Sequence, residues 1–170
     1  MMPLPPPLGD GALRLWRLDR ARHAAVWNSG EGSYLAGGRW NGRGRRVIYG
    51  ALDPSTAILE VAVHKTFRSL DTEPHVMTSA RIAEPGQVHL LDVEALPNRN
   101  WLVPGVAGAG QQAFGDALLE RHPIVLLPSV VSRQSWNVLL RADRATALLA
   151  DVTQEAFALD PRLHPAAPGG

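Results

Sequence analysis

The residues best suited to chemistry lie in the run GGRWNGRGRRVIYGALDPSTAILEVAVH, from Gly37 to His64. This run contains a glycine- and arginine-rich loop, the phenol of Tyr49 and the carboxylate of Glu60. The apolar segment that ends near Tyr49 predicts a short strand. Asp53-Pro54 predicts the start of a helix, with Asp53 as the N-cap and proline in the first turn. A cationic loop, an aromatic ring and a carboxylate in one strand-to-helix unit predict a binding cleft.

Glu60 and His64 are four residues apart, so they share one stripe of the predicted helix. From periodicity alone, a solvent-exposed pair is favoured over a catalytic carboxylate. The spacing is not a zinc motif, because a metalloprotease helix carries two histidines four apart with a glutamate beside the first. We expect no metal site, since the remaining histidines are scattered singly: His23, His75, His89, His122 and His164.

Arg17 occupies an unusual position for a cation. Residues 13–18 predict a strand in which Leu13, Leu15 and Arg17 share one face. Arg17 either lies at the strand end facing solvent, which is the commoner arrangement, or points into a site.

The loop at residues 28–46 matches no standard nucleotide motif. Its glycines fit neither the P-loop pattern nor the pattern GxGxxG between a strand and a helix. All but one of the 17 cationic side chains are arginine, and a local excess in the first third suggests a phosphate-bearing ligand. High-GC codon usage explains the total count equally well, but explains the clustering less well. The run RGRR at 43–46 could instead follow a nucleic-acid backbone, although the net charge is only +1.

Ser129 follows a predicted buried strand in the sequence LLPSVVS. It lacks a GxSxG elbow and evident His–Asp partners, so we interpret it as a hydrogen-bond donor at a strand exit rather than a nucleophile.

Composition predicts one soluble domain. The 170 residues are 45% hydrophobic and 19% charged, which is ordinary for a globular protein with a real core. The absence of cysteine excludes disulfides and thiolate chemistry. No apolar run is long enough to cross a membrane and no secretory signal is evident, so we expect a cytoplasmic protein with no membrane partner.

The order of elements favours an α+β fold. We predict strands at 47–51, 75–82, 87–93 and 124–127, weaker ones at 136–140 and 147–150, and helices at 54–67 and 111–121. Residues 19–27 predict one or two helical turns. Without regular βαβ alternation, an antiparallel or mixed sheet with flanking helices is expected. We predict a proline-rich leader at 1–12, one domain at 13–163 and a flexible tail at 164–170.

Seven short blocks, in order, resemble RES-domain proteins, the toxin components of RES–Xre toxin–antitoxin modules. They are WR at 16–17, GGRWN at 37–41, VIYGA at 47–51, AILEVAVH at 57–64, LPSVV at 127–131, SWNVLL at 135–140 and FALDPRL at 157–163. One departure is that the segment after SWN lacks a histidine that the family often carries.

The resemblance implies a single ADP-ribosyltransferase-like domain that acts on NAD⁺. Family members degrade NAD⁺ by hydrolysis or phosphorolysis, or transfer its ADP-ribose to a protein. NAD⁺ would be the substrate, with phosphate as a co-substrate in phosphorolysis, and no separate cofactor is implied. The catalytic residues map onto Glu60, Arg17 and Tyr49, and the substrate-binding residues onto Arg39, Trp40, Asn41 and Ser129.

The chemistry of these side chains is compatible with that activity. Nicotinamide is cationic in NAD⁺ and leaves neutral, so one carboxylate suffices where ordinary glycosidases use two. Glu60 would stabilise the positive charge on the ribose, Arg17 would bind phosphate, Tyr49 would stack on nicotinamide or close the ribose pocket, and Ser129 would hold the carboxylate or the nicotinamide amide.

The resemblance also implies partners. An Xre-like helix-turn-helix antitoxin encoded next to the gene would cover the cleft, direct nucleic-acid contact would belong to that antitoxin, and a homodimer is expected. One alternative is ADP-ribosylation of a specific protein. A second is a non-catalytic nucleotide or nucleic-acid binding module.

Overall fold

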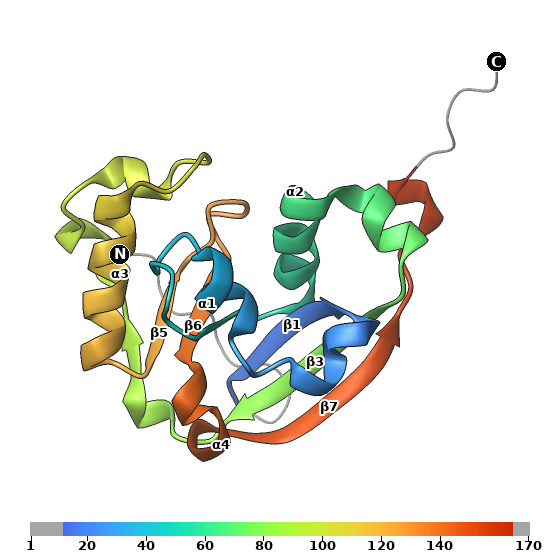
Figure 1. Ribbon diagram of the computed structural model, residues 1–170, viewed down its shortest axis with the longest axis horizontal. Coiled ribbons are helices and arrows are strands. Elements are labelled where there is room, and N and C mark those ends of the chain that lie inside the picture. The colour runs from blue at the N-terminus through green and yellow to red at the C-terminus, as the bar shows by residue number, and fades with distance from the viewer. Residues whose placement is uncertain (1–11, 165–170) are drawn as a thin grey trace.

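The computed structural model describes residues 12–164, which form one mixed α+β domain around a seven-stranded sheet (Figure 1). The predicted leader, apart from its last residue, and the predicted tail beyond residue 164 lie outside the described residues. The strand order is β4-β5-β6-β2-β1-β3-β7. The strands are β1 Arg14–Arg20, β2 Val47–Ala51, β3 His75–Ile82, β4 Val88–Leu90, β5 Ile124–Pro128, β6 Trp136–Arg141 and β7 Leu149–Phe157.

The pairing between neighbouring strands is shortest between β1 and β2. These strands pair only at Trp16 and Ala51, whereas β1 and β3 pair along the whole of β1, from Arg14 to Arg20. All neighbouring strands are antiparallel except β4 and β5, which are parallel. The sheet therefore consists of two well-paired parts that separate beyond a single point of contact, and the predicted mixed sheet is confirmed.

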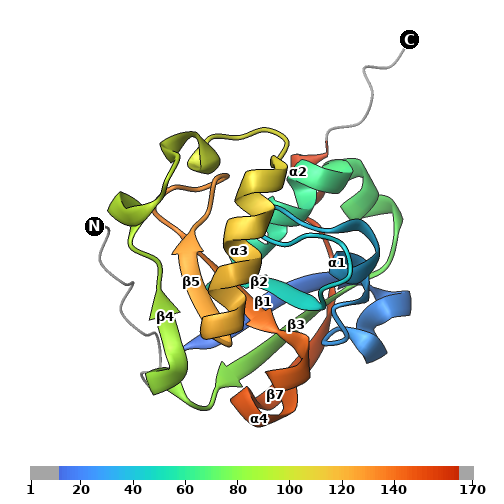
Figure 2. The ribbon, with the colours of Figure 1, turned by 60° about the vertical axis from the view of Figure 1, so that its left-hand side comes forward.

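Four α-helices flank the sheet: α1 Glu31–Ala36, α2 Pro54–Thr72, α3 Ala109–Arg121 and α4 Ala145–Leu148. Short 3-10 helices connect them: η1 Ala21–Val26, η2 Pro85–Gln87, η3 Val93–Ala95, η4 Arg99–Leu102, η5 Ala142–Arg144 and η6 Pro161–Leu163. Figure 2 shows α3 lying across the part of the sheet that contains β5. No helix among residues 12–164 is long and apolar enough to span a membrane.

The start of α2 follows the predicted capping pattern. The carboxylate of Asp53 accepts hydrogen bonds from the backbone N–H of Thr56 at 2.9 Å and from its hydroxyl at 2.6 Å, and Pro54 occupies the first helical position. The helix is kinked at Thr66, which has φ 66° and ψ 155°. Because a β-branched residue rarely adopts positive φ, this position is strained.

Three apolar clusters hold these elements together. The largest contains residues from both parts of the sheet, including Leu15, Ile48 and Val138, together with Trp27 and residues of α4. A second lies between α3 and the sheet, and a third lies between α2 and β1.

The structure differs from the sequence-based expectations in several places. The predicted loop at 28–46 contains the short helix α1, α2 continues beyond the predicted end at 67, and the strand predicted at 87–93 is limited to β4. Residues 147–148 of the strand predicted at 147–150 belong to α4, and β7 continues to Phe157. Most of β7 is exposed, so its sequence LADVTQEAF lacks the apolar alternation on which strand prediction depends.

Candidate functional site

Glu60 lies in a hydrogen-bonded cluster built from three segments that are far apart in the sequence. Its Oε1 atom accepts hydrogen bonds from the Ser129 hydroxyl at 2.7 Å and from the Asn137 side-chain N–H at 2.7 Å. Glu60 is half-buried in α2, Ser129 follows β5, and Asn137 lies in β6. Oε2 of Glu60 forms no hydrogen bond or ion pair within residues 12–164, so this oxygen can contact a ligand.

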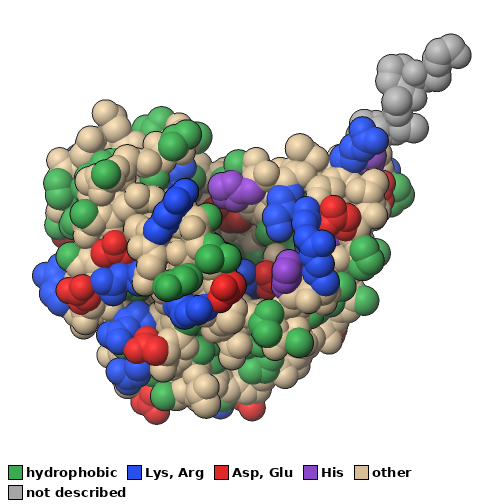
Figure 3. Space-filling model, viewed as in Figure 1, with side chains coloured by type: hydrophobic (Ala, Val, Ile, Leu, Met, Phe, Trp, Pro, Cys, Tyr) green, Lys and Arg blue, Asp and Glu red, His purple; other side chains and the backbone are tan. Residues whose placement is uncertain are grey.

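The face that carries α1 and α2 is hollowed between these two helices (Figure 3). Acidic, basic and histidine side chains border the hollow.

Ser129 is fully engaged by its hydrogen bonds. Its hydroxyl oxygen accepts from the backbone N–H groups of Val131 and Ser132, both at 3.1 Å, while its single proton is donated to Glu60. A hydroxyl has one donor and two acceptor sites, so all three are occupied. This arrangement fits the predicted hydrogen-bond donor at a strand exit and leaves no free lone pair for nucleophilic attack.

Asn137 is the member of the cluster that sequence analysis did not select. The residue was recognised only as part of the block SWNVLL, and its partner Glu60 is 77 positions away. The motif and the buried strand pattern around it were the only available signals.

Arg17 lies where the two parts of the sheet separate. Its guanidinium forms a two-point ion pair with Asp19, at 2.8 Å for both bonds, and donates to the backbone carbonyl of Tyr49 at 2.9 Å. The side chain is 29% exposed. A guanidinium has five N–H groups, so two remain available, one on each terminal nitrogen. Arg17 therefore joins β1 to β2 and can still contact an anion.

The Tyr49 hydroxyl forms its hydrogen bonds with the GGRWN loop. It donates to Asn41 Oδ1 at 2.6 Å and accepts from the backbone N–H of Trp40 at 3.1 Å. Burial is the main reason that the pKa of Tyr49 is raised well above its usual value. A Cβ atom on Gly38 would lie 2.5 Å from the Tyr49 hydroxyl oxygen, so only glycine fits there. The contacts of Tyr49 with a ligand would thus come from its ring rather than from its hydroxyl.

Trp40 and Asn41 point into the protein. Trp40 is 2% exposed, with its ring against Trp101 and Phe114, and Asn41 is fully buried. The Asn41 amide donates to backbone carbonyls of its own loop and of α1. Neither side chain offers a surface to a ligand, and both stabilise the loop.

Arg39 links the same loop to the segment before α3. It donates to the backbone carbonyl of Gly105 at 2.7 Å and to that of Trp101 at 3.4 Å. On α3, Gln112 donates to the Gly38 carbonyl at 2.8 Å and Asp116 accepts from the Gly42 N–H at 3.1 Å. The loop that contains GGRWN at 37–41, called the motif loop below, is therefore held against α3 by these hydrogen bonds.

The only lysine, Lys65, lies near the cations of β1. Partial burial lowers the pKa of Lys65, and the positive charges of Arg20 and Arg17 lower it further, while the carboxylates of Asp19 and Glu73 raise it. Arg17 and Arg20 are themselves paired with these two carboxylates. His64, one residue earlier, is exposed and lies four residues from Glu60 on α2 as predicted, but no hydrogen bond joins the two side chains.

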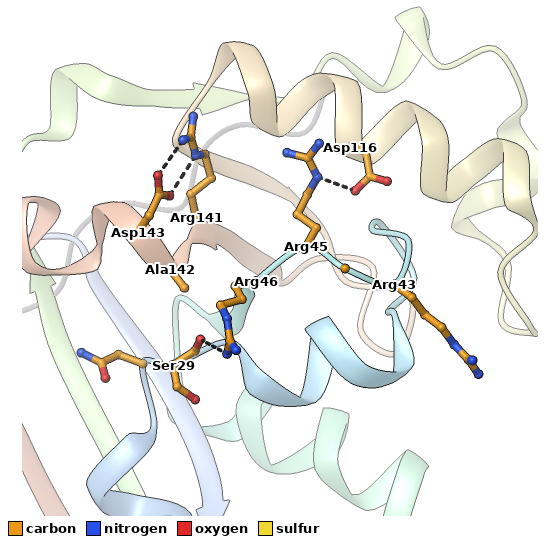
Figure 4. A pocket seen from close by; sticks show the side chains of 10 residues that line it. Ser29, Arg43, Arg45, Arg46, Asp116, Arg141, Ala142 and Asp143 are labelled. Atoms are coloured by element: carbon orange, nitrogen blue, oxygen red, sulfur yellow. Dashed lines mark hydrogen bonds and ion pairs between the residues drawn. The ribbon is translucent and has the colours of Figure 1, made fainter.

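A cavity of about 640 Å³ that is not lined by Glu60 lies around Arg43, Arg45, Arg46, Arg141 and Asp143 (Figure 4). Its arginines do not converge on a common point. Arg45 pairs with Asp116 and Glu120, Arg46 with Glu31, and Arg141 with Asp143, while Arg43 points away from the others. This pairing weakens the RGRR run as a continuous surface for a nucleic-acid backbone, and we place the candidate site at Glu60.

Comparison with known proteins agrees with the resemblance found in the sequence. The model of the RES domain matches residues 14–162. A protein named Toxin Res from Photorhabdus laumondii is 32% identical over 152 residues, covering 88% of this chain and 96% of the relative. Toxin Res from Pseudomonas putida is 31% identical, covering 88% and 98%. A protein named Prs ADP-ribosylating toxin from Sphingobium is 29% identical, covering 74% and 80%.

A solved structure has the same fold. It is the toxin–antitoxin complex MbcT–MbcA of M. tuberculosis, matched with a TM-score of 0.65 at 20% identity over 89% of this chain and 86% of the other. The predicted α+β fold is confirmed by the mixed sheet with its flanking helices, and the chain shares the fold of this solved structure. With a family model that covers almost the whole described chain, the protein belongs to the RES domain family.

Proposed function

We propose that this protein is the toxin of a toxin–antitoxin module and that it consumes NAD⁺ by cleaving the nicotinamide–ribose bond. The observation that carries the proposal is the geometry of Glu60. One carboxylate oxygen is held by Ser129 and Asn137, and the other is free for a ligand.

A single carboxylate of this kind suits the reaction. Cleavage places positive charge on the ribose, while nicotinamide leaves as a neutral molecule and needs no general acid. The Glu60 carboxylate, held in advance in the correct orientation, stabilises that charge more in the transition state than in the bound substrate. Within residues 12–164, no second carboxylate is hydrogen-bonded to Glu60.

The cations that we propose for binding the diphosphate are Arg17 and Lys65. Arg17 keeps two N–H groups free, and Lys65 lies within the electrostatic influence of Arg17 and Arg20. In this proposal Arg17 binds phosphate and also fixes β1 against β2. Tyr49 contributes its ring to the ribose or nicotinamide pocket.

The acceptor of ADP-ribose is water or phosphate in this proposal, and a protein side chain in the alternative. The alternative is favoured by one relative, which is named an ADP-ribosylating toxin. Both reactions use the same cleavage step, so Glu60 has the same role in each.

We further propose that an antitoxin covers the cleft. The matched structure is a toxin–antitoxin complex, and this chain exposes apolar side chains on the helices beside the hollow, Tyr34 and Leu35 on α1 and Leu59 and Val63 on α2. The predicted Xre-like antitoxin with a helix-turn-helix, the homodimer and the cytoplasmic location belong to the same proposal. Co-expression with the neighbouring gene and purification through a tag on that product tests the partner.

The test of the function is incubation of purified protein with NAD⁺, with and without phosphate, followed by chromatography of the products. Hydrolysis gives nicotinamide and ADP-ribose under both conditions, whereas phosphorolysis requires phosphate. Labelled NAD⁺ with cell lysate gives a discrete labelled band if a protein is the acceptor. A folded sample that releases no nicotinamide and labels no protein would rule the proposal out.

A further inference from the structure

We propose that Asn137 is a positioning residue for Glu60, which fixes the carboxylate so that Oε1 faces the sheet and Oε2 faces the ligand. This inference rests on the proposed function, because it concerns the same carboxylate. The direct contact is the hydrogen bond from Asn137 Nδ2 to Glu60 Oε1 at 2.7 Å.

The orientation of the Asn137 amide follows from this contact. Only the N–H side of an amide can donate to a carboxylate, and the reversed orientation would place two acceptor oxygens against each other. The other end of the amide, Oδ1, is buried and has no hydrogen-bond partner within residues 12–164. Glu60 alone therefore determines how this side chain is turned.

Fold stability does not account for an asparagine at this position. Asn137 lies in β6, opposite Leu127 on β5 and Ala51 on β2. A buried carbonyl oxygen without a partner destabilises a protein, and an apolar side chain of similar size would avoid that penalty. A residue that is unfavourable for stability but contacts a candidate catalytic group is expected where function selects it.

Asn137 and Ser129 hold Glu60 from two different elements. Ser129 donates from the exit of β5, and its own oxygen is fixed by two backbone N–H groups, whereas Asn137 donates from within β6. Two donors on one oxygen leave the carboxylate little freedom to rotate. Removal of either donor allows the carboxylate to turn. A substitution that removes the donor of Asn137 or that of Ser129 should therefore lower kcat more than it raises KM.

The first test replaces the amide by an apolar side chain, Asn137→Leu. We expect kcat for NAD⁺ cleavage to fall by about 10²-fold, since a displacement of ~1 Å at a reacting group can have that effect. KM should change little, and the midpoint of thermal unfolding should stay the same or rise. The matched control is Ser135→Ala, which removes a hydroxyl that contacts Ser132 and not Glu60; it should keep the activity of the wild type.

The second test distinguishes positioning from simple packing. In Asn137→Asp, the new carboxyl can donate to Glu60 only when it carries a proton, and two ionised carboxylates in contact repel each other. The activity of this variant should therefore recover as the pH is lowered, unlike that of Asn137→Leu. A pH profile with the shape of the wild-type profile would contradict the proposal.

A third measurement does not depend on activity. In the wild type, one side-chain N–H proton of Asn137 should resonate downfield by NMR because it donates to a carboxylate, and Glu60→Ala should remove that shift. If the Asn137 N–H resonates at an ordinary chemical shift that Glu60→Ala does not change, the positioning role is wrong, whether or not the protein cleaves NAD⁺. If the wild type cleaves NAD⁺ and Asn137→Leu cleaves it at the same rate, the positioning role is also wrong, while the proposed function stands. A loss of activity that is matched by a loss of folded protein would show a structural role instead.

Discussion

Ser129 illustrates how the hydrogen bonds of one side chain limit the chemistry that it can perform. Its oxygen accepts from two backbone N–H groups and its proton lies on Glu60. A nucleophile needs a free lone pair and a base to take its proton, and Ser129 has no such free lone pair. At the scale of the residue, Ser129 acts by holding the carboxylate.

We therefore predict that Ser129→Ala slows the reaction without abolishing it. Loss of one hydrogen bond to a charged group amounts to about 1.5–3 kcal/mol, or roughly a 10- to 150-fold decrease in kcat. Steady-state kinetics measures this decrease, and mass spectrometry should find no covalent adduct on Ser129 in the wild type. Ser132→Ala is the control, because its backbone N–H still donates to Ser129. Complete loss of activity in a folded Ser129→Ala protein would argue for direct participation of the serine.

The resemblance to the RES family assigned Glu60, Arg17 and Ser129 to the site, whereas the local pattern alone favoured a solvent-exposed Glu60 and an Arg17 at a strand end. The structure brings Glu60 and Ser129 into contact across 69 positions and places Arg17 against the Tyr49 strand. Asn137 lies in one of the blocks that carry the resemblance, but no local pattern shows that it contacts Glu60 across 77 positions. Trp40 was expected to contact the substrate, whereas packing against α3 and Trp101 buries that ring. Which of these residues touch NAD⁺ stays a prediction.

At the scale of the element, α3 holds the motif loop in place. Gln112 and Asp116 bind the loop backbone, and the helix approaches it so closely that a Cβ atom on Gly115 would lie 1.9 Å from the Trp40 carbonyl oxygen. Such an approach is possible only for glycine. The helix was predicted from its periodicity, but nothing in its own sequence identifies the loop as the surface that it contacts.

We predict that Gly115→Ala separates the loop from α3 and lowers the free energy of unfolding by roughly 1–3 kcal/mol or more. Urea denaturation measures the change. Gly110→Ala, on the same helix, is the control, because its Cβ atom would have its nearest neighbour, on Trp101, at 3.9 Å. That substitution should be neutral or mildly stabilising. Equal stability of the two variants would contradict the role that we assign to the close approach.

The start of α2 was predictable because its signals are local: a capping aspartate, a proline in the first turn and an apolar stripe. The strand β7 was predicted only in part. It is an exposed edge strand, and its pairing with β3 is visible only in the fold. The kink at Thr66 was also not predicted, because a threonine in a helical pattern gives no signal for positive φ.

At the scale of the whole molecule, one histidine pair should make stability depend on pH. The rings of His89 and His122 stack with their centroids 3.9 Å apart and an interplanar angle of 7°. Burial lowers the pKa of His89, and the charges of His122 and Arg121 lower it further. The folded state therefore favours the neutral form of His89. Its contribution to the free energy of unfolding is present above the ordinary histidine pKa of about 6.5 and is lost as the pH falls below that value.

We predict that the wild type loses more stability than His89→Gln when the pH is lowered from neutral into the acid range below the histidine pKa. Chemical denaturation at both pH values measures the difference. His23→Gln, which changes an exposed histidine, is the control and should behave like the wild type. An equal loss in wild type and His89→Gln would show that the stacked pair does not titrate as described.

The central claim is that the charge of Glu60 drives cleavage of NAD⁺. The most direct measurement is the initial rate of nicotinamide release by the wild type and by Glu60→Gln, side by side. The amide oxygen can still accept from Ser129 and Asn137, so the fold should persist, but the neutral side chain cannot stabilise positive charge on the ribose. We expect release by the wild type, no detectable release by folded Glu60→Gln, and full activity in Glu120→Gln, a control on the exposed side of α3. Release at the same rate from the wild type and Glu60→Gln, or none from a folded wild type, would contradict the claim.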